Sequence, residues 1–305
     1  MPVADKPVII EVALNGETPK TRNAHVPRSV SEIVEDGLRC LDAGAAIVHN
    51  HNDEAVLGTT VSHDAQPYID AWRDILAERP EAILYPTMGS GGSHTTIEQR
   101  YSHIPALAEA GVLGQGLIDP GSVNLGGRDA DGLPTPSDGV YLNSYIDARY
   151  MFDTCNRLGC GASISIFEPG FLRVALAYAR AGKMPAGVMV KLYFGGGGRR
   201  QGLSFGLPPT LPSLEAYLSM LTGTGLAWSV AVLGGDVVES GMARWALERG
   251  GHVRVGLEDY AGPQRPTNVE LVRQAVTLCG AVGRPVAGCT EARSLLGLAD
   301  RPGAV

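Results

Sequence analysis

The chain has 305 residues, of which 44% are hydrophobic and 19% are charged, and its formal net charge is −7. This size suits one large domain or two small ones, and the mild acidity argues against a nucleic-acid partner. No stretch reaches the roughly 18 apolar residues of a membrane span, and no basic, signal-like start precedes an apolar run. Five cysteines without a Cys-x-x-Cys spacing predict reduced thiols and a cytoplasmic protein.

Short β-branched runs alternate with longer helical patterns along the chain. The predicted strands are 8–14, 45–51, 82–87, 114–119, 162–167, 188–194, 227–233 and 252–257. The predicted helices are 30–43, 64–79, 95–110, 142–158, 170–182, 212–222, 237–249 and 268–283. Helix starts are indicated by Ser29 or Ser31 before the first helix and by Pro212 with Ser213 near the sixth. Glycines typical of C-caps stand where helices should stop: Gly44, Gly111, Gly159, Gly182, Gly250 and Gly283.

These strand–helix repeats predict the fold class α/β, with a single (β/α)8 TIM barrel over residues 1–305. The strands are near-continuous apolar runs, which is typical of parallel strands buried on both faces. A doubly wound open sheet is the alternative, but the turn after the first strand lacks the Gly-x-Gly-x-x-Gly spacing of nucleotide-binding folds. Loops at 120–141 and 195–211 are too long for plain connectors, and we expect them to border the active site.

Candidate catalytic side chains follow the strands at the end where such barrels place their active sites. The second strand ends in His49 and His51, which point to one face because residues two apart in a strand do so. Glu17 follows the first strand and Glu258 follows the eighth. Strand 8 closes against strand 1, and strand 2 lies beside strand 1. These side chains should therefore converge on one arc of the barrel mouth.

Two neutral imidazoles and a carboxylate, with a fourth position open, form a catalytic zinc site, so Glu258 is the expected third ligand beside His49 and His51. Mn²⁺, Co²⁺ or Fe²⁺ could occupy the same ligands. One histidine at a strand end is more often a satisfied polar residue, but the paired spacing at a barrel mouth favours a metal. Metal-dependent amidohydrolases also begin with His-x-His. They need further histidines after strands 5 and 6, which here read SISIFE and KLYFGG.

Three segments resemble a known family: CLDAGAAIVHNH at 40–51, DPGSVN at 119–124 and GGHVRVGLEDY at 250–260. They are similar to the β-keto acid cleavage enzymes, of the 3-keto-5-aminohexanoate cleavage enzyme type, and 268–298 resembles the C-terminal end of that family. The resemblance runs nearly end to end. It implies a zinc-dependent barrel, commonly a homotetramer. Such an enzyme takes a β-keto acid and acetyl-CoA and gives acetoacetate and a new acyl-CoA.

The resemblance also implies roles for single residues. His49, His51 and Glu258 match the metal ligands, Asp259 matches a base, Arg254 an arginine beside it, and Glu17 a glutamate that helps to hold the substrate. The matching substrate-binding residues after strands 3 and 4 are Ser90, Gly91, Gly92, Ser122 and Asn124. Elementary chemistry agrees, because a Lewis-acid metal polarises the carbonyl next to C2 and a nearby carboxylate can take the C2 proton. The loop 195–202, with Arg199 and Arg200, either faces the CoA phosphates or forms a solvated lid.

Two segments depart from the family pattern. Asn50, Asn52 and Asp53 stand between and after the histidines, where members usually have apolar and basic residues. Ser163 and Ser165 replace acidic residues of the fifth strand, which makes an amino-substituted substrate doubtful. We therefore expect the chemistry to be retained and the substrate side chain to differ. Two other classes remain open: a metal-dependent carbon–carbon lyase or aldolase that works without CoA, and a metal-binding barrel without catalysis.

Overall fold

The computed structural model describes residues 3–52, 64–89, 95–127, 129–136, 139–196 and 205–299. Eight parallel strands form one sheet in the order β3-β2-β1-β10-β9-β8-β7-β4. Their bounds are β1 Ile10–Ala13, β2 Ile47–Asn50, β3 Ile83–Pro86, β4 Gln115–Ile118, β7 Gly161–Ile166, β8 Met189–Gly195, β9 Trp228–Leu233 and β10 His252–Val255. The sheet nearly closes into a barrel, and Gly114 N donates to Leu84 O at 2.8 Å between its two end strands.

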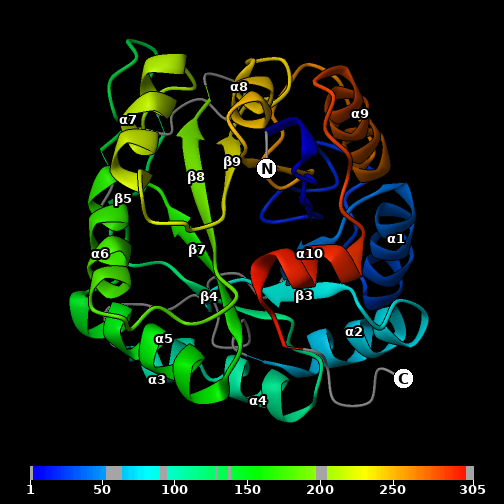
Figure 1. Cartoon of the computed structure of the whole chain (residues 1–305), viewed down its shortest axis with the longest axis vertical. Coiled ribbons are helices and arrows are strands. Elements are labelled where there is room, and N and C mark those ends of the chain that lie inside the picture. Colours follow the sequence, from blue (N-terminus) through cyan, green and yellow to red (C-terminus); the bar gives the residue numbers. More distant parts are fainter. Residues whose placement is uncertain are drawn as a thin grey trace.

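Helices surround the strands in chain order, so the predicted (β/α)8 barrel is confirmed (Figure 1). A short 3₁₀ turn, η1 Val3–Asp5, precedes the barrel. The helices are α1 Val30–Ala43, α2 Gln66–Glu78, α3 Ile97–Arg100, α4 His103–Glu109, α5 Tyr145–Leu158, α6 Pro169–Arg180, α7 Leu211–Leu221, α8 Met242–Glu248, α9 Asn268–Ala281 and α10 Cys289–Leu296. Each predicted strand lies within three residues of an observed one at either end.

The expected helix boundaries hold in most places. Ser29 caps α1, and Glu32 completes a capping box with it. The six predicted C-cap glycines all have positive φ, between 62° and 117°. At α7 the cap is Thr210, whose side chain accepts from Ser213 N, so the helix predicted from 212 begins one residue earlier, at Leu211.

Four segments differ from the expected elements. The helix predicted over 95–110 is split into α3 and α4, because Pro105 has no N–H to continue a helix from the preceding turn. The helix predicted over 237–249 shrinks to α8, because Asp236 Oδ1 accepts from Val238 N and Glu239 N and fixes a turn there. The loop 120–141 contains an antiparallel hairpin, β5 Val123–Asn124 with β6 Val140–Tyr141, and α10 is an additional helix.

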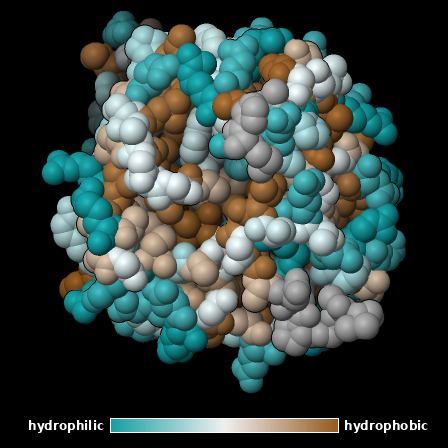
Figure 2. All heavy atoms as spheres, viewed as in Figure 1, coloured by the Kyte–Doolittle hydropathy of each residue, from teal (hydrophilic) through white to brown (hydrophobic). Residues whose placement is uncertain are grey.

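The additional helix α10 covers the end of the barrel where the strands begin. Figure 1 shows α10 crossing in front of the strands, and Cys289 at its start lies against Ala45 O, just before β2. Leu298 packs next to Gly161 and Gly187, where an added Cβ would lie 2.5 Å and 2.3 Å from its Cδ2. On this same face, hydrophobic side chains gather near the centre inside a mostly hydrophilic rim (Figure 2). The closed end leaves the opposite mouth for chemistry.

Neighbouring residues of each strand face different surroundings. On β8, Phe194 stacks edge-on against Tyr217 of α7, whereas the alternate residues Lys191 and Tyr193 lie among charged side chains inside the barrel. The outer face is apolar and forms the helix–sheet core. The inner face is unusually polar. All five cysteines are free, and within the described residues no helix is long and apolar enough to cross a membrane.

Candidate metal centre and active site

The three expected metal ligands come together at the barrel mouth. β1 pairs with β2 on one side and with β10 on the other, which brings His49 and His51 next to Glu258. Their nearest donor atoms all lie within 4.8 Å of one another. His49 is buried, and the other two are partly buried. This geometry agrees with the convergence that strand order predicted.

Two glycines allow Glu258 to approach the first strand so closely. An added Cβ on Gly16 would lie 2.2 Å from Glu258 Cγ, and one on Gly256 would lie 2.1 Å from Ala13 O. Their φ angles are +49° and +136°, in the region that favours glycine. The backbone of both loops is therefore shaped around this carboxylate.

The protonation of His49 fits a metal ligand. Its Nδ1 faces the carbonyl of Tyr85 at 3.2 Å, so the proton belongs on Nδ1 and the lone pair on Nε2. Burial lowers the pKa of His49 to about 4, which keeps the ring neutral near pH 7. Nε2 then faces Glu258 Oε2 at 3.1 Å, a contact between two acceptors. A cation between them removes that repulsion, so the residues present fit a divalent metal.

The charge of Glu258 also suits this role. Burial opposes its ionisation, but Arg254 and the two histidines hold its pKa well below the usual range. Its Oε1 lies 3.5 Å from His51 Nε2 and 2.8 Å from Arg254 Nη2. Glu258 is therefore an anionic carboxylate, and each of its two oxygens faces Nε2 of a different histidine.

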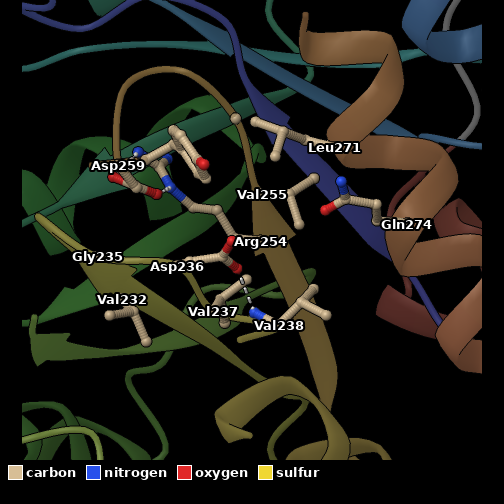
Figure 3. A pocket seen from close by; sticks show the side chains of 12 residues that line it. Val232, Gly235, Asp236, Val237, Val238, Arg254, Val255, Asp259, Leu271 and Gln274 are labelled. Atoms are coloured by element: carbon tan, nitrogen blue, oxygen red, sulfur yellow. Dashed lines mark hydrogen bonds and ion pairs between the residues drawn. The ribbon is translucent and has the colours of Figure 1, made fainter. Parts of the chain in front are cut away.

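Arg254 connects this carboxylate to its sequence neighbour. Its Nε donates to Asp259 Oδ2 at 2.7 Å and its Nη2 to Oδ1 at 3.2 Å, a two-point contact that Figure 3 shows beside a cavity of about 20 Å³. Burial and the nearby Glu258 raise the pKa of Asp259 in spite of Arg254. A carboxylate with a raised pKa is a better proton acceptor at neutral pH, and the longer contact leaves Oδ1 the freer oxygen.

The sequence reasoning missed three residues beneath Arg254. Glu11 Oε1 accepts from Arg254 Nη1 at 2.8 Å, and the same Nη1 lies 2.8 Å from the hydroxyl of Tyr85. That hydroxyl donates to Glu11 and accepts from Lys191 Nζ at 2.6 Å. A signal was available, because Glu11 and Lys191 are lone charges inside the apolar runs VIIEVAL and VMVKLYF. A charge in such a strand must face a polar interior.

The remaining expected residues are less closely joined to the centre. Glu17 lies on the loop after β1 and its side chain is exposed. The hydroxyl of Ser122 donates to Asn143 O and accepts from Asn143 N, so it holds the hairpin in place. Ser122 and Asn124 line a cavity of about 380 Å³ with Glu168. Ser90, Gly91 and Gly92, Asp53, and Arg199 with Arg200 lie outside the described residues.

The asparagines around the histidines have structural contacts. Asn50 Oδ1 accepts from Trp72 Nε1 of α2 at 2.8 Å, and Asn52 Nδ2 donates to Asp64 O at 2.9 Å. Asn50 therefore lies on the outer face of β2, which its alternation with His49 requires. These contacts tie the strand tip to the next helix and give no support to Asn50 or Asn52 as contacts of the substrate side chain.

Comparison with known proteins identifies the family. The family model of the beta-keto acid cleavage enzymes matches residues 7–298, and the chain belongs to that family. The 3-oxoadipate:acetyl-CoA acetyltransferase of Cupriavidus necator is 31% identical over 96% of this chain and 95% of its own length. A 3-keto-5-aminohexanoate cleavage enzyme of Acetoanaerobium sticklandii is 28% identical over 96% and 99%. ObcA in complex with oxaloacetate shares the fold, with a TM-score of 0.65 and 17% identity over 90% of this chain and 67% of ObcA.

Proposed function

We propose that this enzyme condenses a β-keto acid with acetyl-CoA and releases acetoacetate and a new acyl-CoA. The observation that carries the proposal is the single guanidinium of Arg254, which holds both Glu258, a ligand of the candidate metal centre, and Asp259, a buried carboxylate of raised pKa. Acetyl-CoA appears in the name of the 31% identical relative and supports the second substrate.

In the proposed reaction Asp259 takes a proton from C2 of the β-keto acid. The metal, with zinc as the expected ion, supplies Lewis-acid stabilisation for the charge that develops on the neighbouring carbonyl oxygen. The new carbanion attacks the acetyl carbonyl of acetyl-CoA and expels the CoA thiolate. The thiolate then attacks the original ketone carbon, and the bond from that carbon to C2 breaks. Acetoacetate leaves after C2 regains a proton, and the acyl chain leaves on CoA.

The charges of the chain's own residues suit this substrate. Arg254 remains cationic because the carboxylates around it outweigh the cost of its burial, and its pKa is raised. It therefore fixes Asp259 and keeps positive charge beside a carbanion and a carboxylate. His49 and His51 stay in place through backbone contacts of the same strand tip, where Asn15 Oδ1 accepts from His51 N at 2.8 Å.

The direct test is an assay for acetoacetate with a panel of β-keto acids that includes 3-oxoadipate and 3-keto-5-aminohexanoate. We expect acetoacetate from at least one acid, and only when acetyl-CoA is present. A chelator should abolish product formation, and added Zn²⁺ should restore it. Cleavage without acetyl-CoA would instead indicate a lyase or aldolase. Metal binding without turnover of any acid contradicts the proposal and indicates a metal-binding barrel.

We also propose that the protein assembles as a tetramer, as the family resemblance implies. Large apolar side chains are exposed along the hairpin and the start of α5, namely Leu125, Leu133, Val140, Leu142, Tyr145 and Ile146. Exposed apolar groups of this size favour contact with another chain. Light scattering after size exclusion should give four times the 32.0 kDa mass of one chain.

A further inference from the structure

A buried lysine lies inside the barrel, outside the expected active-site residues. Lys191 is 2% exposed and stands on β8 between Ser165 of β7 and Ser229 of β9 in the register of the sheet. Burial lowers its pKa, whereas Glu11 acts in the opposite direction. An ammonium group removed from water is costly unless other groups compensate it, so its partners indicate what it does.

The partners of Lys191 lie on strands from the other side of the barrel. Nζ donates to the hydroxyl of Tyr85 on β3 at 2.6 Å and lies 3.6 Å from Glu11 Oε1 on β1. The Tyr85 hydroxyl also accepts from Arg254 and donates to Glu11, so all its hydrogen-bonding positions are used. Lys191 and Arg254 are thus joined through one hydroxyl and one carboxylate.

The charges explain why a second cation is needed there. Arg254 is in contact with three carboxylates, Glu11, Glu258 and Asp259. Without Lys191, the whole charge of Glu11 would act on Arg254 and draw its guanidinium towards β1, away from Asp259. With Lys191 on the same Glu11 oxygen, that attraction is shared, and the Nε and Nη2 edge of Arg254 remains on Asp259 and Glu258.

We propose that Lys191 is a positioning residue for proton transfer by Asp259: it balances Glu11 so that Arg254 holds Asp259 in the productive orientation. This inference rests on the proposed function. Among the described residues, the polar contacts of Lys191 are with Tyr85 and Glu11, and not with Asp259, Glu258 or the histidine ligands. The inner face of β8 thus contributes to a site built on β2 and β10.

The test measures the first half-reaction alone. The metal-loaded protein is placed in D₂O with a β-keto acid that it accepts and no acetyl-CoA, and NMR follows the exchange of the C2 protons. We expect exchange well above the rate without enzyme. In Lys191→Met the saturated exchange rate per metal-loaded, folded site should fall about 10- to 100-fold, which is typical when a supporting partner of a site is removed. Metal content and the KM for acetyl-CoA in the complete reaction should stay unchanged.

Two further variants separate this role from a structural one. Glu11→Gln/Lys191→Met removes both charges and should regain most of the lost exchange, because Arg254 is no longer drawn towards β1. Ser229→Ala is the matched control, since it neighbours Lys191 in the sheet and its buried hydroxyl has no partner among the described residues. It should exchange at the wild-type rate. If Lys191→Met does not fold, Lys191→Gln removes the same positive charge but keeps a polar end group, and it should show the same loss.

The outcomes distinguish this inference from the proposed function. No enzyme-dependent exchange in the wild-type protein would overturn the proposed function itself. Exchange by the wild type with an equal rate in Lys191→Met overturns only the role of Lys191. A loss in the double variant as deep as in the single one also overturns it, because charge balance on Glu11 would then not be the cause.

Discussion

The two faces of the barrel strands differ in chemistry although they alternate residue by residue. On β1, Ile10 and Val12 are fully buried apolar residues, while Glu11 between them belongs to the charged interior. On β7, Ile164 stands between Ser163 and Ser165 in the same way. The outer face buries apolar side chains against the helices, whereas the inner face buries charged side chains that form ion pairs with each other. The outer face therefore contributes to stability alone, whereas the charged groups of the inner face form the candidate site and, where they pair, also stabilise the fold.

The largest effect is expected on the inner face. Asp259→Asn keeps the shape of the side chain but removes the proton acceptor, so acetoacetate formation should fall by about 10²- to 10⁴-fold. Metal content, measured by elemental analysis, should not change. Asp236→Asn is the matched control, because its Oδ1 can still cap Val238 N and Glu239 N. Wild-type turnover in Asp259→Asn would show that another group is the base.

A second prediction concerns stability on the inner face. Arg254→Met leaves Glu11, Glu258 and Asp259 with Lys191 as the remaining cation of the cluster among the described residues. Loss of one partner from buried ion pairs costs about 3–5 kcal/mol, which urea unfolding would measure as a lower free energy of unfolding. Arg39→Met serves as control, since its pair with Glu35 is exposed and contributes little. An equally stable Arg254→Met would mean that the interior carboxylates take up protons instead.

The metal ligands and Arg254 show how much of the site the sequence could predict. Local sequence patterns predicted the strands and most helices. The convergence of His49, His51 and Glu258 followed from the strand order, because a closed parallel barrel allows few alternative orders. The contacts of Tyr85 with Arg254 and Lys191 could not be predicted in this way. They depend on side-chain lengths across the barrel interior, between strands that are not neighbours in the sheet.

A third prediction tests the outer face. Ile164→Ala creates a cavity in a fully buried apolar site and should lower the free energy of unfolding by about 2–5 kcal/mol. The rate of acetoacetate formation per folded molecule should stay at the wild-type value. Its neighbour Ser163→Ala removes a buried hydroxyl without a partner among the described residues, so stability should change little. A catalytic loss in Ile164→Ala as large as that in Asp259→Asn would break the division between the two faces.

The smallest expected effect concerns His252, at the beginning of β10 and far along the strand from the mouth. Its Nδ1 accepts from Ile9 N at 2.9 Å, so the ring is neutral with its proton on Nε2. Burial, with smaller effects of Arg284 and Lys6, lowers its pKa to about 3. An unfolded histidine titrates near pH 6.5. The contribution of His252 is therefore complete above pH 6.5, and it is lost as the pH falls from there towards 3, where the unfolded chain binds more protons.

His252→Asn isolates this contribution, because the Asn oxygen can replace Nδ1 as acceptor and does not titrate. Between pH 6.5 and 4.5, urea unfolding of metal-free protein should show a steeper loss of stability in the wild type, by roughly 1.4 kcal/mol per pH unit. His49 and the interior carboxylates titrate in both proteins, so their effects cancel in the difference. The same pH dependence of stability in both proteins would show that His252 binds its proton as readily in the folded state as in the unfolded chain. Activity at pH 7 should be the same in both, since this histidine supports the backbone of β1 and not the metal centre.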